Sequence, residues 1–107
     1  MLAAGGTGGH LFPAYALAEE LARRDLIVDL VTDERGDRYG TGFPARMTYQ
    51  VPSATLAGRS PFELGRTGLR LAQGIRRAYK LLGAVKPRVV IGFGGYPTFP
   101  PLLAARL

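Results

Sequence analysis

A glycine-rich segment close to the start of the chain carries the residues best suited to chemistry. Residues 5–10 read GGTGGH, so that four glycines and a threonine precede the only histidine of the sequence. Glycine lets the backbone approach a ligand closely and adopts positive φ angles that other residues avoid. Backbone N–H groups exposed in this way at a helix N-terminus bind phosphate groups. We therefore expect an anion, and specifically a diphosphate, to bind here.

A second glycine-rich segment, GFGGYPT, occupies residues 92–98. Each of the two segments follows an apolar run that predicts a strand and precedes a predicted helix. The carboxyl ends of parallel strands lie at one edge of a sheet, where α/β proteins bind their ligands. One such segment would fit a tight turn equally well, but two at equivalent positions favour an anion site that they share and predict that they lie side by side.

The positions of the apolar residues predict alternating strands and helices. Strands are expected at residues 2–4, 26–32, 47–51 and 88–92, and helices at 13–24, 61–82 and 99–107. The second helix has a clear start, because Ser60, Pro61 and Glu63 form a capping box with proline in the first turn. The apolar runs at 26–32 and 88–92 are typical of buried parallel strands. The expected fold class is α/β, a Rossmann-like doubly wound parallel sheet.

Composition excludes several classes of protein. The 107 residues are 47% apolar and 21% charged, which is typical of a small globular domain. The absence of cysteine excludes a disulfide framework and a thiolate metal site, and we expect neither a metal nor a cofactor. No signal peptide or membrane-spanning run is expected. The net charge of +6 points to an anionic partner, such as nucleic acid, an anionic membrane surface or a phosphorylated ligand.

The spacing of the glycines bears on which phosphate ligand binds. The Walker pattern G-x-x-x-x-G-K-[ST] is absent, and the dinucleotide pattern G-x-G-x-x-G fails because Leu11 stands where its last glycine would be. Asp33 nevertheless follows the second strand, where a ribose-binding acid would lie. We expect it instead to be a solvent-exposed residue at the strand end. A dinucleotide-binding module stays open as an alternative, and so does a basic interaction domain without catalysis.

Two longer stretches resemble the signatures of a bacterial enzyme family. Residues 5–24 read GGTGGHLFPAYALAEELARR, and residues 86–105 read KPRVVIGFGGYPTFPPLLAA. Both resemble N-terminal signatures of the MurG family of N-acetylglucosaminyltransferases. The resemblance covers essentially the whole chain, although it is loose between the two stretches. It implies the N-terminal half-domain of a GT-B glycosyltransferase, in which two Rossmann-like domains face each other across a cleft.

The resemblance also implies an activity. The family transfers GlcNAc from UDP-GlcNAc to the MurNAc 4-hydroxyl of undecaprenyl-pyrophosphoryl-MurNAc-pentapeptide, called lipid I, and forms lipid II with inversion. This reaction of peptidoglycan synthesis takes place at the cytoplasmic face of the bacterial inner membrane. Residues 1–107 are expected to be part of the acceptor- and membrane-binding domain. The nucleotide-sugar domain of the family lies outside this sequence, so we expect the chain to be inactive unless a C-terminal domain on another chain completes it.

The resemblance assigns ligands to residues of both glycine segments. The expected donor contacts, to UDP-GlcNAc, are Thr7, Gly8 and Gly9, and the expected contacts to the acceptor diphosphate are Gly94, Gly95 and Tyr96. His10 is the candidate catalytic residue, because histidine exchanges protons near neutral pH. It would act either as the base for the attacking hydroxyl or as a phosphate contact. The alternative is a structural ring that caps the following helix or bonds the second segment.

The predicted helix at 61–82 is the candidate membrane surface. The expected docking residues are Leu69, Arg70, Ile75, Arg76 and Arg77. Apolar residues interspersed among cations suit an anionic lipid leaflet. A solvated basic face without a partner is the alternative. Nucleic acid is not expected, because the sequence offers neither an aromatic stacking platform nor a helix suited to reading bases.

Overall fold

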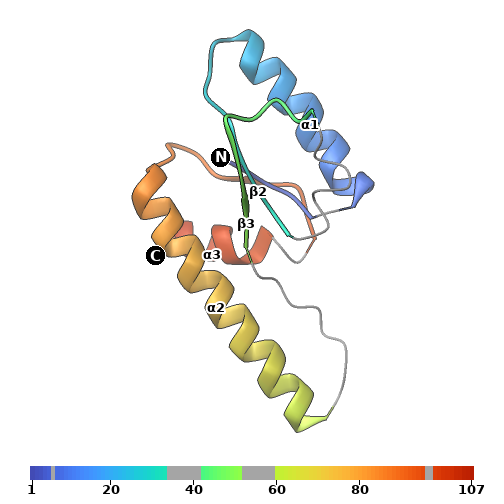
Figure 1. Cartoon of the computed structure of the whole chain (residues 1–107), viewed down its shortest axis with the longest axis vertical. Coiled ribbons are helices and arrows are strands. Elements are labelled where there is room, and N and C mark those ends of the chain that lie inside the picture. Colours follow the sequence, from blue (N-terminus) through green and yellow to red (C-terminus); the bar gives the residue numbers. More distant parts are fainter. Residues whose placement is uncertain (6, 34–41, 52–59, 96–97) are drawn as a thin grey trace.

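The computed structural model describes residues 1–5, 7–33, 42–51, 60–95 and 98–107 (Figure 1). In chain order the elements are β1 (Leu2–Ala3), α1 (Gly8–Arg23), β2 (Asp29–Thr32), β3 (Met47–Gln50), α2 (Pro61–Val85), β4 (Ile91–Gly92) and α3 (Phe99–Arg106). The strands form one parallel sheet in the order β3-β2-β1-β4. In this order β1 is an inner strand. It lies between β2, the next strand along the chain, and β4, the last one.

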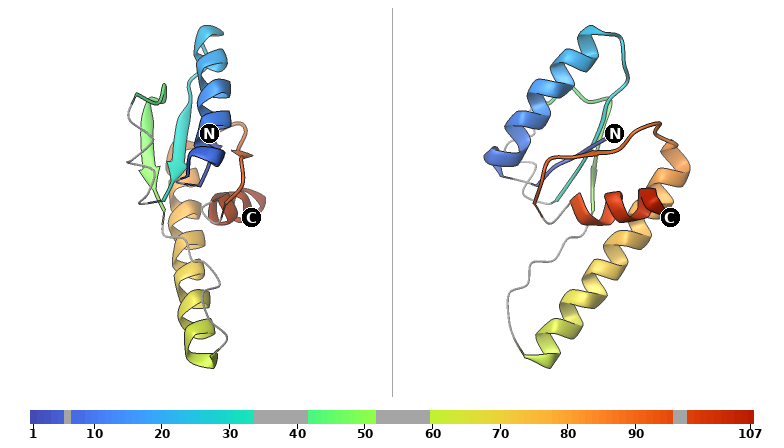
Figure 2. Two further views of the ribbon diagram at one scale, coloured as in Figure 1. Left: turned by 90° about the vertical axis from the view of Figure 1, so that its right-hand side faces the viewer. Right: turned by 180° about the vertical axis from the view of Figure 1, so that it is seen from behind.

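Helices cover both faces of the sheet, because successive residues of the inner strands point to opposite sides. Leu2 and Leu30 belong to a buried cluster with Leu11, Ala14 and Ala18 of α1. Ala3 and Val31 lie on the other face in a second cluster, against which Leu81 of α2 packs. Figure 2 shows α1 lying along the strands, whereas much of α2 extends beyond the sheet. The predicted doubly wound arrangement is therefore confirmed.

The structure corrects two of the expected strands. β2 begins at Asp29 rather than at residue 26, because Leu26 and Ile27 are 55% and 70% exposed in the connection that follows α1. β4 comprises two residues and is exposed, whereas a buried strand was predicted. It occupies an edge of the sheet, so its apolar residues are covered from fewer sides than those of an inner strand.

Helix α1 begins earlier than the apolar pattern predicts. Thr7 is its N-cap residue, and the Thr7 carbonyl accepts hydrogen bonds from the N–H groups of His10 and Leu11 at 3.1 and 2.9 Å. Pro13 therefore lies inside the helix rather than in its first turn. The first N–H groups of a helix have no intrahelical partner, and here they belong to Gly8 and Gly9. Helix α2 begins as predicted, since the Glu63 N–H donates to Ser60 Oγ at 3.2 Å.

An ion pair joins the start of β2 to the residue that precedes β3. Arg46 Nε and Nη2 donate to the two carboxylate oxygens of Asp29 at 3.2 and 2.7 Å. The Asp29 side chain is only 5% exposed. Its hydrogen bond and its negative charge raise the pKa of Arg46 above the usual value. The pair thus supplies a buried carboxylate with a charged, bidentate partner.

Replacing Arg46 by methionine is expected to lower the melting temperature of the chain, because a buried carboxylate then loses its cationic partner. Circular dichroism melting curves measure this effect. Arg23→Met is the matched control, because Arg23 pairs with Glu20 on the exposed face of α1. Pairs of that kind contribute only about 0.2–1 kcal/mol. Equal decreases in melting temperature in the two variants would show that Arg46 contributes no more to stability than an arginine of an exposed ion pair.

Candidate functional site

The two glycine-rich segments meet where neighbouring strands end, as predicted (Figure 1). β1 and β4 pair directly, and the Phe93 N–H donates to the Ala3 carbonyl at 2.8 Å. One step further along, the Gly5 N–H donates to the Gly94 carbonyl at 3.1 Å. Residues 89 positions apart in the sequence are therefore hydrogen-bonded, and the first turn of α1 lies beside the second segment.

The imidazole of His10 occupies the space between the two segments. A Cβ atom built on Gly5, Gly94 or Gly95 would lie 3.0, 3.1 or 3.2 Å from the nearest ring atom of His10. Such distances are shorter than ordinary van der Waals contacts, so a side chain at any of these positions would displace the ring. The glycines thus have a structural role that the sequence analysis did not assign, because they make room for the imidazole.

Thr7 fixes the orientation of this ring. Its hydroxyl lies 2.9 Å from Nδ1 of His10, and the tautomer decides which of the two groups donates. The Thr7 side chain makes no capping bond to α1, so the hydroxyl serves the histidine instead. The opposite edge of the ring faces Gly94, where a Cβ would be 3.3 Å from Nε2. A direct role for His10 toward a ligand would therefore use Nε2.

The second segment has a backbone that favours glycine. Gly94 and Gly95 have φ angles of +100° and +83°, a region that residues with a side chain rarely adopt. The Gly95 carbonyl accepts hydrogen bonds from the Thr98 hydroxyl at 2.7 Å and from the Thr98 N–H at 3.2 Å. Sequence analysis did not select Thr98, although a hydroxyl residue directly before a proline-rich helix start was a usable signal. The predicted contact Tyr96 lies outside the described residues.

The expected donor contacts lie in the first turn of α1 and differ in how open they are. Gly9 is exposed, and no atom lies within 4 Å of a Cβ built on it. A Cβ on Gly8 would approach the ring of Phe12 to 3.0 Å. The Gly9 backbone is therefore accessible to a ligand, whereas Gly8 lies under an aromatic side chain that is itself 64% exposed.

Asp33 corrects another expectation. Its side chain was expected to face solvent, but the residue is only 7% exposed directly after β2. β2 is the immediate neighbour of β1, so the position is the one at which a dinucleotide-binding protein would place its ribose-binding acid. Geometry alone therefore keeps that alternative open. No group of three or more potential metal-ligating side chains occurs within the described ranges.

Helix α2, whose first half projects from the sheet (Figure 2), carries the expected docking residues. Leu69 is 63% exposed, the three arginines of the predicted set are exposed, and Ile75 is partly buried. The fully buried residues of α2 are Gly74 and Ala78, in its second half. None of the helices within the described residues combines the length and apolarity that crossing a bilayer requires.

The projecting end of α2 also carries an aromatic residue that sequence analysis did not select. Phe62 is 75% exposed, and the guanidinium carbon of Arg66 lies 6.0 Å from the centre of its ring, a cation–π arrangement. Leu64 follows at 47% exposure. Exposed apolar and basic side chains thus occur from the start of the helix to Arg77, which extends the candidate docking surface beyond the predicted residues.

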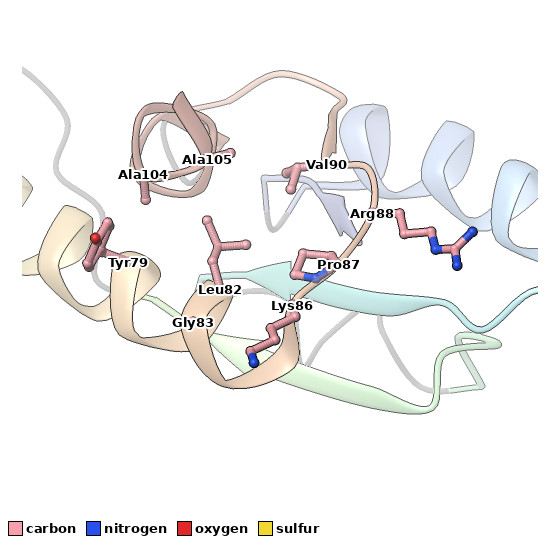
Figure 3. Close-up of a pocket in the computed structure, with 9 residues that line it drawn as sticks. All are labelled: Tyr79, Leu82, Gly83, Lys86, Pro87, Arg88, Val90, Ala104 and Ala105. Atoms are coloured by element: carbon pink, nitrogen blue, oxygen red, sulfur yellow. The ribbon is translucent and has the colours of Figure 1, made fainter. Parts of the chain in front are cut away.

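A separate groove of about 380 Å³ lies between α2, α3 and the segment that precedes β4 (Figure 3). Leu82 and Val90 line it together with Ala104 and Ala105 of α3. Figure 3 shows the charged ends of Lys86 and Arg88 directed away from this apolar wall. The residues around β4 that line the groove, from Lys86 to Val90, lead into the start of this strand, whereas the glycine segment lies at its other end. The groove is therefore not part of the glycine site.

Comparison with known proteins decides between the open alternatives. Residues 1–107 match the family described as the glycosyltransferase family 28 N-terminal domain. The chain belongs to this family. Membership in family 28 favours a glycosyltransferase over a dinucleotide-binding module or a basic interaction domain without catalysis. It also agrees with the resemblance carried by the two glycine-rich signatures.

Two relatives of this family 28 chain carry the same name. A protein of Nitrobacter hamburgensis is 63% identical over 107 residues, and one of Rhodopseudomonas palustris is 58% identical over 105 residues. Both are named UDP-N-acetylglucosamine–N-acetylmuramyl-(pentapeptide) pyrophosphoryl-undecaprenol N-acetylglucosamine transferase. The chain spans 29% of the length of each of them.

A solved structure gives the same result for the fold. The crystal structure of Acinetobacter baumannii MurG matches with a TM-score of 0.82 at 28% sequence identity. The match covers 99% of this chain and 31% of that one. It confirms the predicted fold class, a Rossmann-like N-terminal half-domain of the GT-B type.

Proposed function

We propose that this chain is the acceptor-binding part of an enzyme that transfers GlcNAc from UDP-GlcNAc to the MurNAc 4-hydroxyl of undecaprenyl-pyrophosphoryl-MurNAc-pentapeptide. The observation that carries the proposal is the junction of the two glycine segments around His10. Gly94 and Gly95 offer a close backbone approach to an acceptor diphosphate, and the open N-terminus of α1 lies beside them. Relatives named for this reaction support the choice of substrates.

The proposed mechanism is a direct displacement at the anomeric carbon of GlcNAc. It requires a base for the attacking hydroxyl and stabilisation of the departing UDP. The N–H groups of Gly8 and Gly9 lie at the positive end of the α1 dipole and would interact with the donor phosphates. His10 lies between these groups and the acceptor segment, held by Thr7. Its Nε2 would receive the hydroxyl proton or contact a phosphate.

The proposed location is the cytoplasmic face of the bacterial inner membrane, where the chain would be a peripheral protein. Helix α2 would dock on the anionic leaflet through Leu69, Arg70, Ile75, Arg76 and Arg77. The exposure of its arginines and the apolar residues between them support this assignment. Docking there would bring the acceptor segment close to a substrate whose lipid tail stays in the bilayer.

Transfer by a chimera tests this function. In the Nitrobacter hamburgensis relative, the matching residues are replaced by these 107, and transfer from radiolabelled UDP-GlcNAc to a short-chain lipid I analogue is measured. The chimera is expected to form product. The 107-residue chain alone is expected to form none, because one domain supplies only one wall of the cleft that aligns the substrates and excludes water.

A second experiment adds the separately expressed remainder of the relative to the 107-residue chain. It separates the proposed division of labour between two domains from the proposed transfer reaction itself. Product that appears only after this addition supports an acceptor half that another domain completes. Product from the chain alone would contradict that division of labour. A folded chimera that binds UDP-GlcNAc but transfers nothing to the acceptor would contradict the proposed function.

A further inference from the structure

We infer that Thr98 is a positioning residue that holds Gly94 and Gly95 in the shape proposed to bind an anion, an inference that rests on the proposed function. Thr98 is the N-cap residue of α3 and is 5% exposed. Its hydroxyl makes no capping bond to that helix. Instead the hydroxyl donates to the Gly95 carbonyl at 2.7 Å, where the Thr98 N–H also donates at 3.2 Å. The side chain is thus committed to the glycine segment.

The glycine segment needs such an anchor because its own backbone is permissive. A glycine peptide rotates more easily than others, and rotation here would turn a carbonyl oxygen toward the space proposed for the diphosphate. In the structure the Gly94 carbonyl accepts from the Gly5 N–H, and the Gly95 carbonyl accepts from Thr98. Both oxygens accept hydrogen bonds from the protein and are therefore held away from the space proposed for the anion. Of these bonds, the one from the Thr98 hydroxyl is made by a side chain and can be removed by substitution.

Packing of Thr98 against Gly92 keeps the Thr98 hydroxyl within hydrogen-bond distance of the Gly95 carbonyl. A Cβ built on Gly92 would lie 3.5 Å from Cβ of Thr98 and 2.7 Å from Cδ1 of Leu102. The missing side chain at Gly92 therefore allows the start of α3 to pack directly on β4. Thr98 is placed by the strand beneath it, and the hydroxyl transmits that placement to Gly95. The chain of contacts runs from β4 through Thr98 to the glycines that border His10.

Thr98→Val tests the inference, because valine keeps the branched shape of threonine and has a methyl group, which cannot donate a hydrogen bond, in place of the hydroxyl. Inorganic pyrophosphate binding to the 107-residue chain is measured by calorimetry, and the melting temperature is recorded in parallel. Binding is expected to weaken about fivefold, the effect of losing one hydrogen bond. Thr98→Ser, which retains the hydroxyl, is expected to bind as the unmodified chain does. Thr48→Val on the exposed strand β3 is the matched control and is expected to change nothing.

The chimera supplies a second readout that a purely structural role would not alter. Thr98→Val is expected to raise KM for the lipid I analogue while kcat and KM for UDP-GlcNAc stay the same. If Thr98→Val does not fold, Thr98→Ala takes its place in both measurements. A lower melting temperature with unchanged pyrophosphate affinity and unchanged KM would overturn the inference. Failure of the unmodified chain and chimera to bind pyrophosphate would instead overturn the diphosphate site, and the inference with it.

Discussion

Gly95→Ala is expected to reduce kcat/KM of the chimera at least about 100-fold, the cost of displacing a reacting group by roughly 1 Å. The added Cβ would lie 3.1 Å from the Gly5 Cα and 3.2 Å from Nδ1 of His10. The φ angle of +83° adds strain of its own, since alanine avoids this region. The segment must therefore move away from β1, and the proposed diphosphate contacts move with it. Steady-state kinetics with the lipid I analogue measures the loss.

Two other glycine positions make this experiment specific. Gly68 is exposed in α2 with no atom within 4 Å of a built Cβ, so Gly68→Ala is expected to keep full activity. It is also expected to gain up to about 1 kcal/mol in stability, because alanine favours the helix. At Gly8 the nearest atoms to a new methyl group belong to the exposed ring of Phe12, and Gly8 has no positive φ angle, so Gly8→Ala is expected to lose less activity than Gly95→Ala. Near-normal turnover of Gly95→Ala would refute the packed junction.

Replacing Arg70, Arg76 and Arg77 together by glutamine is expected to weaken binding to anionic vesicles about 100-fold at low salt. Each basic residue close to such a surface contributes about 1 kcal/mol, and added salt screens the attraction. Sedimentation with vesicles that contain phosphatidylglycerol measures binding of the chain at several salt concentrations. The unmodified chain is expected to lose affinity as salt rises, and the triple variant to show little salt dependence.

A matched triple variant separates local docking from net charge. Arg23, Arg24 and Arg88 lie outside α2, and their replacement by glutamine lowers the charge of the chain by the same amount. This control is expected to retain most of the vesicle binding. Equal losses in the two triple variants would mean that net charge alone attracts the chain to lipid. Binding to neutral vesicles that salt does not alter would count against docking through α2.

The order of strands and helices could be predicted because it follows from local patterns. The capping box at Ser60 and the repeated apolar positions of α1 depend on neighbours within a few residues. The start of α1 was misjudged because Gly8 and Gly9 have a low intrinsic helix propensity, which tertiary contacts overcome. The predictions of an exposed Asp33 and of a buried strand at 88–92 were also wrong. Both depend on which strand lies beside which, and no local pattern contains that information.

The candidate site was predictable to the same extent. The adjacency of the two glycine segments followed from the rule that parallel strands end at one edge of a sheet. The close packing of Gly95 against Gly5 and His10 could not be predicted, because it joins segments that lie far apart in the sequence and leaves no room for a side chain on Gly95. The hydrogen bond from Thr98 to Gly95 spans only three residues. It escaped notice because a threonine before a helix is first interpreted as a cap.

The imidazole of His10 lies between the two proposed binding surfaces, and this position restricts which substitutions the protein can accept around it. Gly94 borders the ring at Cδ2 and Nε2, whereas Gly95 and the Thr7 hydroxyl both approach it at Nδ1. A side chain added at Gly94 or Gly95 displaces the ring, and a displaced ring would shift the turn proposed to meet the donor. At these two positions the proposed acceptor and donor sites are therefore coupled. A lineage that replaces either glycine to suit a different acceptor would need a second, compensating substitution to restore the donor geometry.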